Sequence, residues 1–309
     1  MTRQTPPADL AASVRARLSK LAAHRGQDLQ LILTRFGVER LLYRLSRVPA
    51  GKKFVLKGAV LFYVWEGEIP RPTQDVDLLG FGDSSPGAVA DLFRAVCNAE
   101  VEPDGLTFLA AKVKAARIRG RQEYGGVRVR LTAMLGRARI PLQVDVGFGD
   151  AVTPKPQGVA FPTLLPFPAA RIHAYPPETA VAEKFEAMVT LGIANTRMKD
   201  FYDLHHLSET HTFEGQVLAK AIRATFDRRG TAIPSDTPVA LGEGFGNDVE
   251  KQAQWRGFLL RGRLKPPLEL PDAIARISAF VMPVVEALRA ESRFHQRWTA
   301  GGSWAASAR

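Results

Sequence analysis

The chain has 309 residues, 46% hydrophobic and 24% charged, and its one cysteine excludes an internal disulfide or a cysteine-based zinc cluster. No run approaches the roughly 20 apolar residues that a membrane helix needs, and the first residues lack the apolar segment of a signal peptide. We therefore expect a cytoplasmic protein with no membrane contact, whose length allows one large domain or two ordinary ones.

The charge is unbalanced, because 42 lysines and arginines stand against 31 acids and give a net charge of +11. An excess of this size attracts polyanions, and nucleic acid is the commonest of these in cytoplasm. The planar guanidinium of arginine suits phosphate, although a GC-rich genome also favours arginine. We expect contact with nucleic acid, and the alternative is a generically basic protein without such a partner.

The first half of the chain is predicted to form an α/β domain with a mixed sheet, preceded by two helices. Helical periodicity, strand-like alternation and the glycine and proline positions give the boundaries. In chain order we predict helices over 8–24 and 27–48, a strand at 54–56, a helix over 59–65, a strand at 75–79, a helix over 86–100, and strands over 106–119, 127–135 and 140–148.

The second half is predicted to be helical and to follow a proline-rich strap. Residues 151–177 contain seven prolines, too many for regular structure, so we expect a linker there. The tail, 299–309, is expected to be disordered. Helices are predicted over 178–191, 199–209, 213–228, 247–260 and 271–290. The expected organisation is N-terminal helices (1–50), a mixed-sheet core (51–150), the strap (151–177), a helical domain (178–298) and the tail.

The most informative pair is Asp75 and Asp77, which lie two residues apart in a predicted strand and so project from the same face. Adjacent carboxylates repel each other, and a divalent cation relieves that repulsion; Mg²⁺ prefers one or two carboxylates with phosphate oxygens and water. Upstream, the turn at Lys57-Gly58 leads into a helix and could receive a phosphate, with Arg71 adding positive charge. The alternative is that the two acids simply pair with Arg71 or Lys57.

A third acid, Asp145, lies between two valines in a predicted central strand. Three carboxylates on adjacent strands can hold two metals about 3.5–4 Å apart, which suits phosphoryl transfer. In that arrangement Asp145 would bind the metal nearest the attacking hydroxyl. Asp150 is a weaker candidate, because it follows Gly149 in a loop-like segment.

Downstream of the strap, Lys184 lies on the apolar face of a predicted helix, where it could reach a triphosphate or could simply extend its amine to solvent. Asp200 and Asp203 share one face of the next predicted helix. They could complete the site, cap the helix or pair with Arg197.

Together these segments resemble the AbiEii/AbiGii nucleotidyltransferase toxins, which include the MenT-type enzymes and lie within the DNA polymerase β-like superfamily. The likeness spans about residues 50–210. The family's first motif, a K-G-G-type turn and then R-x-S/T-x-D-x-D, is matched by Lys57-Gly58-Ala59 and by Arg71, Thr73, Asp75 and Asp77. Its second motif, E-K-h-x-A-h and then R-x-K-D-h-h-D-L with h apolar, is matched by residues 183–188 and 197–204.

The resemblance implies a mixed-sheet nucleotidyltransferase core and a role for each matched residue. Asp75 and Asp77 would bind Mg²⁺ or Mn²⁺, Asp145 is the equivalent of the family's strand acid, and Lys184 would contact the nucleotide phosphates. Substrate-binding candidates are Lys57, Gly58, Arg71, Thr73, Arg197, Lys199, Asp200 and Asp203, with one of the last two completing the site. One departure is Ala59, which replaces a glycine, so that no hydroxyl follows Gly58; Thr73 could supply one instead.

The expected activity is transfer of a nucleotidyl group from an NTP to an acceptor hydroxyl. The better-known relatives modify tRNA 3′ ends, so tRNA is the expected acceptor, and a type IV toxin–antitoxin system with an antitoxin protein is the expected context. Two alternatives remain at this stage: a non-catalytic nucleotide- or RNA-binding module, and a metal-dependent phosphohydrolase that uses water with the same carboxylates.

Overall fold

The computed structural model describes residues 7–73, 75–118, 125–264 and 268–306. The chain forms two compact units. The first contains Met1–Gly149 and Gln157–Ala174, and the second contains Asp150–Pro156 and Tyr175–Arg309. The predicted N-terminal helices therefore belong to the same unit as the sheet, and so does much of the predicted strap.

The first unit is built on a mixed eight-stranded sheet, in agreement with the predicted fold class. Its strands lie in the order β3-β5-β6-β2-β1-β8-β7, and β4 also pairs with β5. β2 is parallel to β6 and β1 is parallel to β8, while the other pairs are antiparallel. The strands are β1 (Phe54–Lys57), β2 (Asp75–Gly80), β3 (Leu106–Phe108), β4 (Lys114–Arg117), β5 (Val127–Leu135), β6 (Ala138–Phe148), β7 (Gln157–Ala160) and β8 (Arg171–Ala174).

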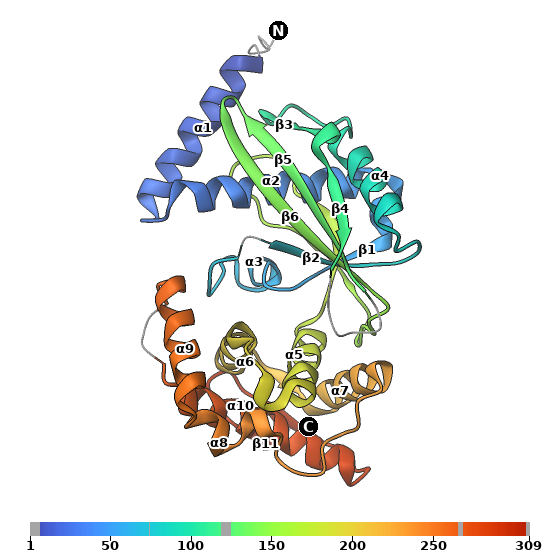
Figure 1. The fold of residues 1–309 in the computed structure, drawn as a ribbon, viewed down its shortest axis with the longest axis vertical. Helices are drawn as coiled ribbons and strands as arrows, with labels where there is room; N and C mark the ends of the chain where they lie inside the picture. Colours follow the sequence, from blue (N-terminus) through green and yellow to red (C-terminus); the bar gives the residue numbers. More distant parts are fainter. Residues whose placement is uncertain (1–6, 74, 119–124, 265–267, 307–309) are drawn as a thin grey trace. The chain divides into compact units, whose positions relative to one another are not determined.

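Helices cover one face of this sheet (Figure 1). The helices of the unit are α1 (Pro7–His24), α2 (Leu29–Arg47), α3 (Leu61–Glu66) and α4 (Pro86–Cys97). Gly37 of α2 lies against Ile140 and Leu142 of β6, and Phe93 of α4 lies edge-on to Phe54 of β1. Because side chains alternate along a strand, the neighbours of these core residues on β2, β5 and β6 project from the opposite face. That opposite face carries the predicted site.

The start of α2 and α4 follows from their sequences. Asp28 accepts hydrogen bonds from the backbone N–H groups of Gln30 and Leu31, and Ser85 accepts one from Ala88. Such caps satisfy donors that the first turn leaves without partners and contribute about 1 kcal/mol each. Helix α2 is then buried along most of its length, which fixes it as the central helix of this unit.

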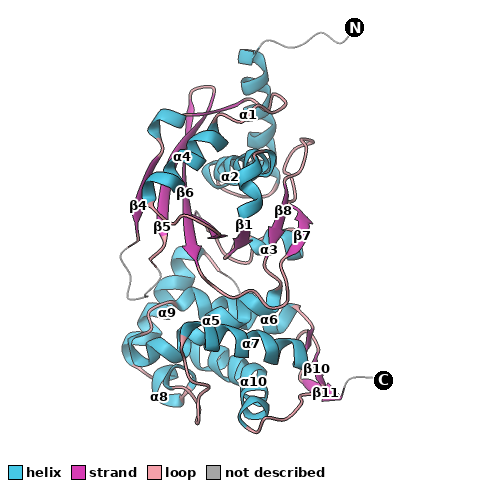
Figure 2. Ribbon diagram, turned by 90° about the vertical axis from the view of Figure 1, so that its right-hand side faces the viewer, coloured by secondary structure: helices cyan, strands magenta, loops and turns pink. Residues whose placement is uncertain are grey.

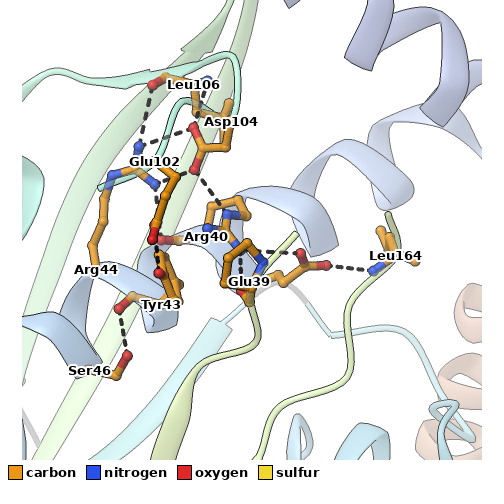
Figure 3. Close-up of polar contacts among 10 residues, drawn as sticks. Glu39, Arg40, Tyr43, Arg44, Ser46, Glu102, Asp104, Leu106 and Leu164 are labelled. Carbon is orange, nitrogen blue, oxygen red and sulfur yellow. Dashed lines mark hydrogen bonds and ion pairs between the residues drawn. The ribbon is translucent and has the colours of Figure 1, made fainter. Parts of the chain in front are cut away.

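A buried charge cluster joins α2 to the segment before β3 (Figure 3). Arg40 Nε donates to Asp104 at 2.9 Å, and Arg44 donates to the same carboxylate at 2.6 and 3.1 Å. Burial alone would raise the pKa of Asp104, but the hydrogen bonds and charges of Arg44 and Arg40 outweigh it and lower that pKa. A buried carboxylate held in this way fixes the position of the chain between α4 and the sheet.

The same helix anchors part of the proline-rich segment, where the prediction of no regular structure was wrong. Glu39 accepts the backbone N–H of Leu164 at 2.7 Å (Figure 3). Arg40 donates to the carbonyl of Pro168 at 2.7 Å. β7 and β8 lie in the segment 151–177, and β8 pairs with β1 in the main sheet. The prolines flank these short strands, so the ladder keeps its N–H donors.

One further difference concerns the predicted strand over 106–119. The structure has β3, a 3-10 turn at Ala110–Lys112 and then β4, and both strands pair with β5. The predicted segment therefore contributes two short strands to one edge of the sheet. Residues 119–124 lie outside the described chain.

The second unit is mainly helical, as predicted, and carries a small sheet (Figure 2). Its helices are α5 (Pro177–Leu191), α6 (Met198–Thr210), α7 (Gly215–Arg229), α8 (Glu243–Gly246), α9 (Val249–Gly262) and α10 (Leu270–Arg289). The sheet has the order β11-β10-β9, with β9 (Phe213–Glu214), β10 (Gln296–Trp298) and β11 (Trp304–Ala306). Within the described ranges, none of the helices is both long and apolar enough to cross a membrane.

The expectation of a disordered tail was wrong for residues 299–306. Trp304 stacks on Phe280 of α10 and lies edge-on to Phe294, and its indole N–H donates to the Phe280 carbonyl at 2.9 Å. Packing so large a ring against Phe280 and Phe294, half-buried, offsets the entropy of ordering the chain around it. Residues 307–309 lie outside the described chain.

Candidate active site

Four charged side chains lie in a row across four neighbouring strands. Lys57 of β1 is opposite Asp77 of β2, Asp77 is opposite Asp145 of β6, and Asp145 is opposite Arg128 of β5. Residues paired in this way project from the same face, so the row reads positive, negative, negative, positive. Asp75 lies on the same face, two residues before Asp77. The register thus brings together the three acids that the sequence singled out.

Arg128 and Asp145 form a two-point ion pair. Arg128 Nε donates to one carboxylate oxygen of Asp145 at 2.8 Å, and Nη2 donates to the other at 2.7 Å. The hydrogen bonds to Asp145 raise the pKa of Arg128, and the charges of Asp75 and Asp77 add to that effect. Arg128 is therefore within electrostatic reach of the whole acidic group.

The turn after β1 brings the backbone against Asp77. Gly58 has φ +74°, a conformation that favours glycine, and a Cβ at this position would lie 2.0 Å from Asp77 Oδ2. Arg71 is buried, and the hydroxyl of Thr73 lies 3.5 Å from the carbonyl oxygen of Asp75. The predicted strand–turn–helix is present, and its glycine makes room for the Asp77 carboxylate.

Of the three acids, Asp75 and Asp77 are the pair that suits a divalent cation. Asp75 and Asp77 are side by side and half-buried, and two carboxylates with phosphate oxygens and water make up a typical Mg²⁺ coordination shell. Across the parts of the chain that the structure describes, no group of three or more His, Cys, Asp or Glu side chains is placed to hold a metal. Both oxygens of Asp145, the third predicted ligand, accept hydrogen bonds from Arg128 instead.

In the second unit, Lys184 of α5 is held by two buried carboxylates of α6. Its Nζ lies 2.9 Å from Asp200 Oδ1 and 2.6 Å from Asp203 Oδ2. Only 14% of the Lys184 side chain is exposed, so the amine is fixed by the two acids and does not simply reach for solvent. Both carboxylates therefore bind the lysine, so the spacing of Asp200 and Asp203 in the sequence could not distinguish their roles.

Asp200 has a second cationic neighbour. Arg197 Nε lies 2.6 Å from Asp200 Oδ2, so the predicted pairing of these two residues is present. Burial alone would raise the pKa of Asp200, but Lys184, Arg197 and the exposed Lys199 outweigh it and lower that pKa to about 2. The carboxylate is therefore ionised at neutral pH.

Asp150 belongs to a different cluster. Arg229 of α7 contacts Asp150 at 3.1 Å, Glu183 at 3.6 Å and Glu186 at 2.6 Å, all within the second unit. Asp145, which the sequence favoured over Asp150, is the acid that lies beside Asp77.

Arg128 is the site residue that sequence reasoning missed. The alternation of residues 127–135 predicted a strand there, without a role for Arg128. The order of strands in the sheet, which places β5 beside β6, could not be read from that local pattern.

The comparison with family models identifies the family of the chain. The model described as "Nucleotidyl transferase AbiEii toxin, Type IV TA system" matches residues 40–281. The chain belongs to the AbiEii family. It is a nucleotidyltransferase of a toxin family from type IV toxin–antitoxin systems, so the resemblance seen over residues 50–210 is confirmed and extends further in both directions.

Solved structures show only a distant likeness to this AbiEii-family chain. JHP933 from Helicobacter pylori is 14% identical with a TM-score of 0.44, and the match covers 82% of this chain and 90% of that one. An H. pylori protein described provisionally as a nucleotidyltransferase is 15% identical with a TM-score of 0.46, covering 82% and 94%. The search of curated proteins found no significant match.

Proposed function

We propose that this chain transfers a nucleotidyl group from an NTP to the 3′ hydroxyl of a tRNA, with a divalent cation bound at Asp75 and Asp77. The observation that carries the proposal is the row of charges on one face of the sheet, with the Gly58 turn packed against Asp77. The net charge of +11 favours a polyanionic acceptor.

At phosphorus the reaction forms one bond and breaks one. The oxygen of the acceptor hydroxyl attacks the α-phosphorus and gives up its proton to solvent water, the bond from that phosphorus to the bridging oxygen breaks, and pyrophosphate leaves. Mg²⁺ or Mn²⁺ supplies neutralisation of phosphate charge when it is bound. Positioning and electrostatic stabilisation provide most of the acceleration in this chemistry.

The contribution of the chain lies in the fixed charges that it brings to the substrate. Asp75 and Asp77 hold the cation, and Gly58 lets the Asp77 carboxylate approach the turn. The family resemblance gives Lys184 a role in binding nucleotide phosphate, and within the second unit Asp200 and Asp203 orient its amine. Because a charge-assisted hydrogen bond is about twice as strong as a neutral one, such a lysine adds to the affinity for the leaving group.

The test combines an α-labelled NTP, total tRNA and Mg²⁺. Label should appear on tRNA with the wild-type chain and disappear with Asp75→Asn and Asp77→Asn, whose folding is checked by circular dichroism. Periodate treatment of the tRNA, which destroys the terminal diol, should abolish labelling. Equal labelling of treated and untreated tRNA would exclude the 3′ hydroxyl, and shortening of the RNA would indicate a phosphohydrolase.

A further inference from the structure

Arg128 has hydrogen-bonding capacity that Asp145 does not use. A guanidinium has five N–H donors in a planar fork. Asp145 accepts two of them, through Nε and Nη2, and these are the side-chain hydrogen bonds that Arg128 makes within the described part of the chain. Among the described residues, three of its donors are therefore not used, and 35% of the side chain is exposed.

The ion pair fixes the direction of this fork. A two-point contact holds the guanidinium plane in one orientation, which a single contact would not do. Arg128 lies on the same face as Asp75 and Asp77 and interacts electrostatically with both. Its remaining donors are thus held beside the carboxylates at which the cation of the proposed function binds.

The same ion pair restricts how many cations the site can take. Both oxygens of Asp145 are engaged by Arg128, so a metal could use this carboxylate only by breaking two charge-assisted hydrogen bonds. The released guanidinium would then stand next to a second divalent cation, and like charges this close repel each other. Arg128 and a second metal therefore compete for one position.

We propose that the site binds a single divalent cation at Asp75 and Asp77, and that Arg128, oriented by Asp145, supplies the second positive charge by contacting the triphosphate. This inference rests on the proposed function and goes beyond it. Arg128 is a substrate-contacting residue, and Asp145 is a positioning residue that acts through Arg128. The rival arrangement has Asp145 release Arg128 and bind a second metal.

Counting bound Mn²⁺ separates the two arrangements. The full-length chain is titrated with Mn²⁺ in the presence of each α,β-methylene ribonucleoside triphosphate in turn, and bound ion is counted by electron paramagnetic resonance. We expect one Mn²⁺ per chain, unchanged in Asp145→Asn. Two ions in the wild type, with one lost in Asp145→Asn, would overturn the inference.

Nucleotide affinity provides a second readout that does not depend on turnover. Loss of a hydrogen bond to a charged group corresponds to a decrease of about 10- to 100-fold, and this is expected for Arg128→Ala. Arg128→Lys keeps the charge without the fork, so it should weaken binding less while one Mn²⁺ remains. Arg139→Ala, an exposed arginine of the neighbouring strand β6 on the same face, is the matched control and should bind nucleotide like the wild type.

A double-mutant cycle tests the positioning role. Asp145→Asn should lower nucleotide affinity in the wild-type background and have no further effect in the Arg128→Ala background, because Asp145 acts only through Arg128. Additive effects, or unchanged nucleotide affinity with two Mn²⁺ in Arg128→Ala, would contradict the inference. Failure of the wild-type chain to bind Mn²⁺ and nucleotide at all would instead refute the proposed function together with it.

Discussion

The contact between Gly58 and Asp77 is the tightest constraint on a single residue of the site. Gly58 combines a positive φ with a backbone that touches the Asp77 carboxylate, whereas Gly67 has a similar φ of +80° and open space around its Cα. The two glycines therefore separate the cost of the backbone conformation from the cost of displacing the acid.

Gly58→Ala is expected to destabilise the chain by more than the roughly 1–2 kcal/mol that a left-handed conformation costs, and to abolish nucleotidyl transfer. Gly67→Ala should show only the conformational cost and retain transfer. Thermal unfolding and the transfer assay measure the two effects. Equal activity in both variants would show that the position of the Asp77 carboxylate is unimportant.

Removal of the Lys184 charge is expected to destabilise the second unit in a pH-dependent way. Breaking a buried pair from one side costs about 3–5 kcal/mol, so Lys184→Met should show a loss of this order at pH 7. The lowered pKa of Asp200 in the wild type means that its stabilising contribution is present above the unfolded pKa and is lost as the pH falls towards about 2. In Lys184→Met, the burial of Asp200 raises the pKa of this carboxyl because the lysine no longer offsets it. Asp200 is then protonated on acidification, which removes the free-energy cost of burying its charge without the lysine.

The difference in unfolding free energy between the wild type and Lys184→Met should therefore shrink between pH 7 and pH 4. Urea unfolding followed by tryptophan fluorescence suits this test, because three of the four tryptophans, Trp255, Trp298 and Trp304, lie in the second unit. Lys220→Met, which removes an exposed charge of α7 in the same unit, is the control. A difference that does not change with pH would contradict the account.

At the scale of single residues, the sequence predicted the features that depend on nearby residues in the chain. Asp75 and Asp77 were placed on one face by the two-residue repeat of a strand, and the register agrees. Arg128 required knowledge of which strands are neighbours, which depends on pairing between segments far apart in the chain. The roles of Lys184, Asp145 and the other matched residues remain predictions that the proposed experiments test.

At the scale of elements, α2 is the scaffold of the first unit, and its Glu39 should make stability depend on pH. Burial raises the pKa of Glu39 to about 7, against the hydrogen bond from Leu164 and the charge of Arg40 (Figure 3). Because this pKa is raised, the contribution of Glu39 to the free energy of unfolding is fully present below the unfolded value of 4.5 and is lost as the pH rises through about 7.

Glu39→Gln keeps an acceptor for the Leu164 N–H and cannot ionise. Relative to the wild type, this variant should gain stability between pH 5 and pH 8, by up to about 3 kcal/mol for a shift of this size. Chemical unfolding at the two pH values measures the gain. Greater stability of the wild type at pH 8 would show that the ionised Glu39 is fully compensated by Arg40.

The errors of element prediction have a common physical origin. β7 and β8 are four-residue strands between prolines, and β11 has three residues, so their own sequences carry little signal. They are ordered by pairing with β1 and β10 and, for β11, by the aromatic contacts of Trp304. Long elements such as β5 and α2 repeat their pattern often enough to be predicted from sequence alone.

At the scale of the whole molecule, the excess positive charge is expected to control binding of the proposed RNA acceptor. Lys114 and Arg130 are exposed and lie opposite each other on the face that carries the row of charges. Like charges directly opposite each other are destabilising unless an anion lies between them. On the described residues of β4, β5 and β6, Asp145 is the one acid that projects from this face.

The double variant Lys114→Ala, Arg130→Ala should weaken tRNA binding and reduce its salt dependence. Each phosphate contact to a single strand contributes about 0.7 to the slope of log affinity against log salt, so the slope should fall by about 1.4. Filter binding at several salt concentrations measures it, without metal or NTP. Arg17→Ala with Lys20→Ala, two exposed residues of α1, removes the same charge elsewhere, and an equal loss of slope in this control would indicate bulk charge alone.

The most direct test of the account compares the fate of two labels in one reaction. With tRNA, Mg²⁺ and the NTP that the chain uses, label at the α-phosphate should become attached to the RNA, and label at the γ-phosphate should be released as pyrophosphate. Both signals should disappear in Asp75→Asn. Attachment of the γ-label, or full labelling by Asp75→Asn, would contradict nucleotidyl transfer at this row of carboxylates.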